Sequence, residues 1–142
     1  MAIDNFRNEY FFLSNFYQRS VCYDGITYDN NEAAFQAQKT LDNEQRKSFA
    51  HMNPSEAKAA GRKVKLRPDW ETVKYDLMFG ICYAKFTQNT DLTEKLLATG
   101  DEELIEGNTW GDRIWGVVNG IGQNHLGKIL MQVRLKLKNK ET

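Results

Sequence analysis

Three polar side chains at helical spacing, Glu32, Gln36 and Lys39, form the first candidate reaction centre of this sequence. They stand four and three residues apart in the segment NEAAFQAQK, so a helix places all three on one face. Such an arrangement of Glu and Lys is usually a solvated surface. If the face is buried, a carboxylate and an amine must pair or take part in chemistry, because burying either charge alone is costly.

A second candidate is the aromatic stretch LSNFY, which contains the small hydrogen-bonding residues Ser14 and Asn15. One interpretation is a turn in which both side chains cap local backbone groups. The alternative is a binding surface, in which Phe16 and its neighbours stack on a flat heterocycle while Ser14 and Asn15 contact ribose or phosphate. The sequence leaves both interpretations open.

The third candidate is a loop rich in glycine, tryptophan and carboxylates that runs from Glu106 to Gly127. Glycine lets the backbone approach a ligand closely, and N–H groups at a helix start favour phosphate. A tight loop anchored in the core by its tryptophans is the competing interpretation, with one asparagine as a cap. The Lys-Ser/Thr pair of a Walker loop and the spacing of a dinucleotide fingerprint are absent. The candidate site residues of this loop are Asp112, Trp115, Gly116 and Asn124.

A basic run, RKVKLR, begins at Arg62. It is either a solvated loop or a surface that contacts phosphate, because an arginine fork holds phosphate oxygens in pairs. His51 and His125 are isolated, and the two cysteines lie in no nucleophile or metal-binding motif. We therefore expect no metal ion, no cofactor and no cysteine nucleophile.

The elements that must position these residues are predicted to be mainly α-helical, with one small β-hairpin near the N-terminus. The hairpin is expected over residues 20–28, about a turn at Asp24-Gly25. Capping residues, prolines and glycines predict helices over about residues 30–40, 43–52, 54–61, 68–88 and 90–100, and a last helix after Gly122.

Apolar residues mark the core faces of the two longest predicted helices. In the helix over 68–88 the stripe consists of Trp70, Val73, Leu77, Ile81 and Ala84. In the last helix it consists of Leu126, Ile129, Leu130, Val133 and Leu137.

Length and composition indicate one ordinary domain over residues 1–142, with 41% hydrophobic and 27% charged residues. The 19 basic and 19 acidic side chains balance, so the total charge predicts no general affinity for nucleic acid or an anionic membrane. The first residues are polar, and no stretch approaches the roughly 20 apolar residues of a membrane span. With two unpaired cysteines expected, we predict a cytoplasmic protein that does not act at a membrane.

Taken together, these segments resemble the NADAR (YbiA-like) family of N-glycosidases. The similarity extends along most of the chain, through FLSNFY from Phe12, NEAAFQAQK from Asn31, Gly61-Arg62, the helix residues Trp70, Lys74 and Met78, Trp115-Gly116, and the ending GxGxNxLGKxLMxVR from Gly120. The resemblance implies a single YbiA-like helical domain that hydrolyses the bond between ribose C1 and an exocyclic amine. Two substrate classes follow from it: ribosylamino-pyrimidine phosphate intermediates of riboflavin biosynthesis, and ADP-ribose joined to guanine in nucleic acid. The second class would pair the protein functionally with an ADP-ribosyltransferase toxin.

With such a substrate, we expect Lys39 to act as an amine nucleophile that forms a Schiff base with the sugar. Burial lowers a lysine pKa and so favours the neutral, reactive amine. Glu32 would move protons to the ring oxygen and the leaving amine, and Asp112 would hold ribose hydroxyls or activate water. A rival route, in which a carboxylate activates water for direct attack, stays open.

The remaining candidate residues would bind substrate. Trp115 and Phe16 would enclose the base, and Arg62 and Arg7 would hold phosphate. The set is completed by Ser14, Asn15, Gln36, Gly116 and Asn124. A module that binds ADP-ribose or a related nucleotide without cleaving it is the alternative function, although a binder needs no amine beside a carboxylate.

Overall fold

The structure, a computed structural model, describes residues 2–141. These residues group into two compact units: a central unit of residues 15–88 and a terminal unit of residues 2–14 and 89–141. The prediction of one domain over the whole chain stays a prediction. Among the helices of residues 2–141, none is long and apolar enough to cross a membrane.

The central unit combines a β-hairpin with helices of unequal length. Its elements are β2 (Gln18–Tyr23), β3 (Ile26–Asn30), α1 (Asn31–Ala37), α2 (Asn43–Lys47), α3 (Pro54–Gly61) and α4 (Trp70–Gln88). The strands are antiparallel, and the turn residues Asp24 and Gly25 have φ angles of 49° and 83°, which suit a tight two-residue hairpin turn. The predicted hairpin is therefore confirmed.

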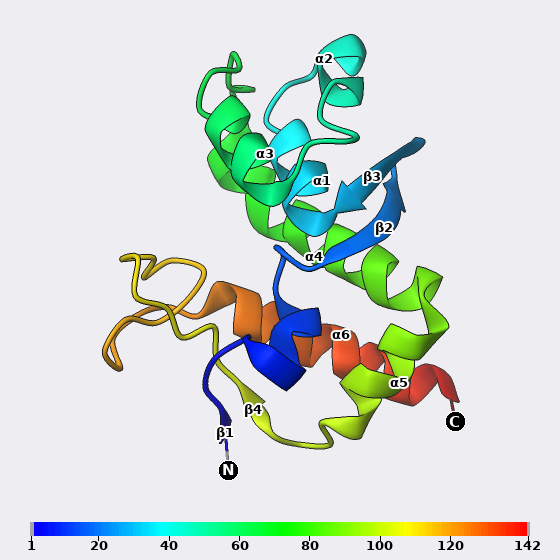
Figure 1. Cartoon of the computed structure of the whole chain (residues 1–142), viewed down its shortest axis with the longest axis vertical. Helices are drawn as coiled ribbons and strands as arrows, with labels where there is room; N and C mark the ends of the chain where they lie inside the picture. The colour runs from blue at the N-terminus through cyan, green and yellow to red at the C-terminus, as the bar shows by residue number, and fades with distance from the viewer. Residues whose placement is uncertain (1, 142) are drawn as a thin grey trace. The chain divides into compact units, whose positions relative to one another are not determined.

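Helix α1 is buried along its whole length and packs against β3, α3 and α4 (Figure 1). Asn30 caps its start by accepting the Ala33 N–H at 2.8 Å. The helix ends at Ala37, earlier than the predicted end at Thr40. Its last residues tighten into a turn, in which the Lys39 N–H bonds to the Gln36 carbonyl at 3.1 Å.

The core face of α4 differs from the predicted stripe. Val73, Leu77 and Ala84 are only partly buried. The buried residues are instead Trp70, Lys74, Met78, Ile81, Cys82, Lys85 and Phe86. The prediction is confirmed for Trp70 and Ile81 and was wrong for the other three residues. Two lysines lie on the buried face instead, where their aliphatic stems pack like apolar side chains.

The terminal unit contains β1 (Ala2–Ile3), the 3-10 helix η1 (Asn8–Leu13), α5 (Thr90–Ala98), β4 (Glu103–Leu104) and α6 (His125–Glu141). Its apolar face on α6 is buried as predicted, including Leu130 and Val133 with no exposed surface. Strands β1 and β4 pair in parallel, with Ile3 opposite Leu104. This pair corrects the expectation that the hairpin is the whole β content, because two-residue strands carry no readable pattern. The fold is α/β and mainly helical.

Candidate functional site

The predicted site residues are divided between the two units of the structure. The central unit holds Asn15, Phe16, Glu32, Gln36, Lys39 and Arg62. The terminal unit holds Arg7, Ser14, Asp112, Trp115, Gly116 and Asn124.

The polar face of α1 is buried. Glu32 is 8% exposed and Gln36 is 6% exposed. The Gln36 Nε2 donates a hydrogen bond of 2.6 Å to the Glu32 Oε2, across one turn of the helix. Lys39 lies one turn further on and is half-buried. A solvated surface is thus excluded for Glu32 and Gln36, and the carboxylate is held inside the protein.

The electrostatic surroundings of Lys39 favour its neutral form. Burial lowers the pKa of this amine, and the Glu32 carboxylate opposes that change in part. Three further cations, Arg62, Lys58 and Lys74, also lower the pKa. An amine with a lowered pKa is uncharged more of the time, so it is a better nucleophile.

An aromatic pair supports the lysine stem. The rings of Phe35 and Trp70 lie 5.1 Å apart at an angle of 49°. The Lys39 Nζ lies 5.9 Å from the centre of the Trp70 ring. The amine therefore lies within cation–π range of an indole ring, and burial is the main cause of its lowered pKa.

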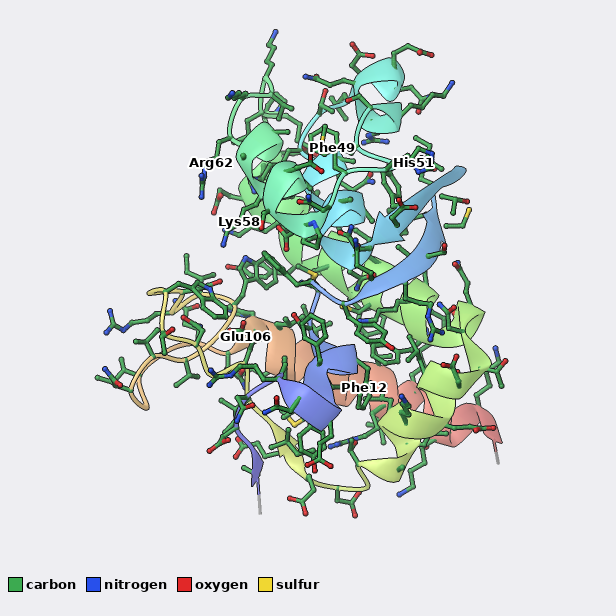
Figure 2. All side chains as sticks on the ribbon, viewed as in Figure 1. Phe12, Phe49, His51, Lys58, Arg62 and Glu106 are labelled. Carbon is green, nitrogen blue, oxygen red and sulfur yellow. The ribbon has the colours of Figure 1, made fainter. Side chains whose placement is uncertain are left out.

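The cations near Lys39 come from α3 and α4. Lys58 and Arg62 stand one turn apart at the end of α3, and in Figure 2 both side chains extend outward from it. The Lys58 Nζ lies 6.0 Å from the Phe16 ring centre. Lys74, on α4, bonds to Glu71 at 2.7 Å, which raises its pKa and keeps it charged. Lys58 was missed in the sequence, because nothing in its neighbours links it to a lysine 19 residues earlier.

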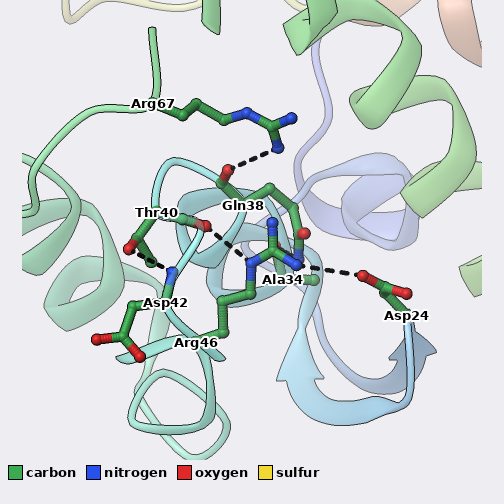
Figure 3. A network of polar contacts seen from close by, with 7 residues as sticks. All are labelled: Asp24, Ala34, Gln38, Thr40, Asp42, Arg46 and Arg67. Atoms are coloured by element: carbon green, nitrogen blue, oxygen red, sulfur yellow. Dashed lines mark hydrogen bonds and ion pairs between the residues drawn. The ribbon is translucent and has the colours of Figure 1, made fainter. Parts of the chain in front are cut away.

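The turn that carries Lys39 is held by donors from two arginines. The Arg67 N–H bonds to the Lys39 carbonyl at 2.8 Å, and its guanidinium bonds to the Gln38 carbonyl at 3.4 Å. The Arg46 Nε donates to the Thr40 carbonyl at 2.8 Å (Figure 3). Three successive carbonyls in the turn after α1 therefore have partners, which fixes the backbone that carries Lys39.

A cavity of about 500 Å³ adjoins these arginines and is lined by Tyr23, Asp24, Gln38, Arg46, Arg67 and Leu77. None of the predicted site residues lines it. Both arginines already bond to carbonyls, and each also pairs with a carboxylate. The charged groups that line the cavity therefore stabilise the fold, and we do not place the reaction in this cavity.

Asn15 ties the start of the central unit to α1. Its carbonyl accepts the Glu32 N–H at 3.1 Å, and its Oδ1 accepts a bond of 3.2 Å from Asn31. Its Nδ2 lies 3.5 Å from the Met78 sulfur. Asn15 thus positions the backbone of Glu32, while its predicted contact with substrate stays a prediction.

In the terminal unit, the loop after β4 is organised by its own polar side chains. The Asp112 Oδ1 accepts the Trp115 N–H at 2.9 Å and the Ile114 N–H at 3.1 Å. Asn108 donates to the Asp112 carbonyl and to the Glu106 Oε2, both at 2.9 Å. These bonds give Asp112 a role in shaping the turn, and its predicted role on ribose or water stays a prediction.

Gly116 and Asn124 hold the loop against neighbouring backbone. A Cβ at Gly116 would overlap both the Glu106 carboxylate and its carbonyl, so only glycine fits there. The Asn124 side chain accepts the Glu106 N–H and donates to the Leu104 carbonyl, each at 2.9 Å. Glu106 lies at the centre of these contacts. It was not chosen as a site residue from the sequence because its contacts with Asn108, Gly116 and Asn124 arise only when the loop folds.

The other candidates of the terminal unit are more accessible. Arg7 is exposed and precedes η1, while Ser14 follows it and donates its N–H to the Phe11 carbonyl at 2.9 Å. Trp115 is half-buried, with its ring 6.3 Å from the His125 ring. The predicted contacts of Arg7, Ser14 and Trp115 with substrate stay predictions.

Comparisons with known proteins identify the family and the fold of this chain. The NADAR domain matches residues 4–138. The N-glycosidase YbiA of Shigella flexneri serotype 5b is 40% identical over 134 residues, which cover 92% of this chain and 83% of that protein. A riboflavin biosynthesis protein of Vibrio vulnificus is 39% identical over 89% of this chain and 35% of its own length. The solved structure of Escherichia coli YbiA superposes with a TM-score of 0.86 at 35% identity, covering 99% of this chain and 86% of that one. The chain belongs to the NADAR domain family.

Proposed function

We infer that this chain is a hydrolase that acts on N-glycosyl bonds. The observation that carries this conclusion is the buried face of α1, where an amine of lowered pKa follows a buried carboxylate by two helical turns. Relatives of about 40% identity over most of the chain are named N-glycosidases, which supports the same reaction class. A binding module without catalysis would gain nothing from a lysine whose pKa is lowered beside a buried carboxylate.

The substrate proposed first is a ribosylamino-pyrimidine phosphate of riboflavin biosynthesis. Two relatives with the NADAR-like segment are named riboflavin biosynthesis proteins, from Vibrio vulnificus and Zea mays, which favours this class. The cations Lys58 and Arg62 beside Lys39 suit a phosphate group on the sugar. The same cations suit the diphosphate of ADP-ribose, so ADP-ribosyl-guanine is the second candidate substrate.

The proposed reaction runs through a covalent intermediate. The N-riboside opens its ring to an imine at C1, and the neutral Lys39 amine adds to that carbon. The Glu32 carboxylate takes a proton from the lysine nitrogen as it adds and passes that proton to the exocyclic amine, which then leaves, so that a lysine imine remains. Water then adds to C1 and releases the sugar as an aldehyde, which regenerates the lysine. One C–N bond is broken and one water is consumed.

Turnover on both substrates tests the proposal. Purified protein would be incubated in parallel with the ribosylamino-pyrimidine phosphate and with an oligonucleotide that carries ADP-ribose on guanine, and product masses would be followed. We expect cleavage by the wild type and loss of cleavage in Lys39→Met and Glu32→Gln. Lys47→Met is the matched control, because Lys47 is exposed on α2 and forms a surface ion pair with Glu44.

The two arms separate the candidates. Cleavage of the pyrimidine riboside alone supports the metabolite function, and cleavage of the oligonucleotide alone moves the assignment to nucleic-acid de-ADP-ribosylation. Tight binding of either compound without any product would instead support the non-catalytic module.

A further inference from the structure

Gly61, at the end of α3, lies directly against the amide of Gln36 on α1. A Cβ built at Gly61 would overlap the Gln36 Oε1 and would come within 2.8 Å of its Cδ. The backbone of Gly61 has no positive φ that would require glycine. The absence of a side chain there therefore serves the close approach of the amide rather than the conformation of the chain.

The amide has few other constraints. Its Nε2 donates to the Glu32 Oε2 at 2.6 Å, whereas its Oε1 is buried and has no hydrogen-bond partner within residues 2–141. A buried acceptor without a partner is uncommon in folded proteins and is often associated with function. Two things consequently orient the amide: the bond to Glu32 and the packing of its oxygen on Gly61.

We propose that Gly61 is a positioning residue, which acts through the Gln36 amide to hold the Glu32 carboxylate in the orientation that proton transfer requires. This inference rests on the proposed function, because it assigns Glu32 the proton transfer. The amide N–H can face Glu32 only while its oxygen occupies the space above Gly61. A methyl group in that space moves the end of a flexible side chain, so it disturbs the site without breaking the backbone.

The test is a double-mutant cycle of Gly61→Ala and Gln36→Ala, measured as kcat and KM on the N-riboside that the wild type cleaves. Gly61→Ala is expected to lower kcat by about tenfold, the effect of one lost hydrogen bond to a charged group, with little change in KM. In the Gln36→Ala background the same change should have less than about a twofold effect, since no amide remains to be displaced.

Two controls, the melting of Gly61→Ala and the activity of a second variant in α3, show whether the loss of kcat comes from a general weakening of the helix. The helix propensity gained with alanine partly offsets the displacement of the Gln36 side chain, so Gly61→Ala should remain folded at the assay temperature, which its melting curve checks. Ala59→Gly weakens the same helix at an exposed position and should leave kcat unchanged. Gln36→Met, which keeps the volume of the side chain and removes the donor, should reproduce the loss seen in Gly61→Ala.

A titration of the Glu32 carboxyl, followed by carbon NMR, gives a readout that needs no turnover. The hydrogen bond from the Gln36 amide stabilises the ionised carboxylate, so the midpoint should move to higher pH in Gly61→Ala. Adding Gly61→Ala to Gln36→Ala should cause no further movement, because that bond is already absent. Equal losses of kcat in both backgrounds, or full activity in Gly61→Ala, would overturn the inference. If the wild type cleaves neither riboside, the proposed function fails, and the titration alone then decides whether Gly61 acts on Glu32.

Discussion

Replacing Asn30 with alanine should destabilise the protein more than removing any exposed helix cap. Asn30 has no exposed surface. Its Oδ1 accepts the Ala33 N–H at 2.8 Å, and its Nδ2 donates to the Gln18 side chain at 2.8 Å and to the Met52 carbonyl at 2.9 Å. The cap contributes about 1 kcal/mol and each of the two donated bonds about the same, so Asn30→Ala should lose about 3 kcal/mol.

For a chain of 142 residues, this loss corresponds to a fall of about 10 °C in Tm. The assay is urea unfolding followed by circular dichroism, with an unchanged m-value as the sign that only stability has changed. Asn53→Ala is the matched control, because Asn53 caps α3 in an exposed position and should cost only about 1 kcal/mol. Equal losses in the two variants would refute the argument that buried partners make the cap of α1 the stronger one. Because α1 carries Glu32, Asn30→Ala should also lower turnover.

Two further variants test other parts of the fold. Burial lowers the pKa of Lys85 to about 8, whereas the unfolded chain keeps this proton to a much higher pH. The free energy of unfolding should therefore rise between pH 8 and 9, where the folded amine loses charge first, and Lys85→Met should abolish the rise in urea titrations. Above that range the Cys82 thiol acts in the opposite direction, because burial raises its pKa to about 12. Asn124→Ala removes the partners of the Glu106 N–H and the Leu104 carbonyl and should cost about 2 kcal/mol in urea unfolding. Asn119→Ala, at a similar positive φ but exposed, should cost less; equal losses would contradict the role of the Asn124 bonds.

Local signals in the sequence predicted several elements well. The Asp24-Gly25 pair predicted the hairpin, and Asn53 followed by a proline predicted the start of α3. The apolar repeat of the last helix also predicted the buried face of α6. Each of these signals acts within a few residues along the chain, which is why the sequence alone was sufficient.

Features that depend on distant residues could not be predicted in the same way. The core face of α4 includes Lys74 and Lys85, which a hydrophobic pattern assigns to solvent. The pairing of β1 with β4 joins segments about 100 residues apart along the chain through strands of two residues each. The turn that follows the early end of α1 is bonded by two arginines that come later in the chain.

The candidate site shows the same division. Helical spacing alone placed Glu32 and Gln36 on one face, and the structure adds that this face is buried. The family resemblance, confirmed by the match over residues 4–138, supplied the reaction class. Neither source identified Lys58 as a neighbour of Lys39 or Gly61 as a neighbour of Gln36, since both contacts arise from the packing of α3 on α1.

Trapping the intermediate tests the central claim most directly, namely that the Lys39 amine attacks the sugar. Borohydride would be added during turnover of the N-riboside, and the protein would be digested and mapped by mass spectrometry. The mechanism predicts a reduced sugar adduct on Lys39 that disappears in Lys39→Arg, whose side chain stays charged. Rapid turnover with no adduct on Lys39 would contradict it and would assign the reaction to water activated by a carboxylate.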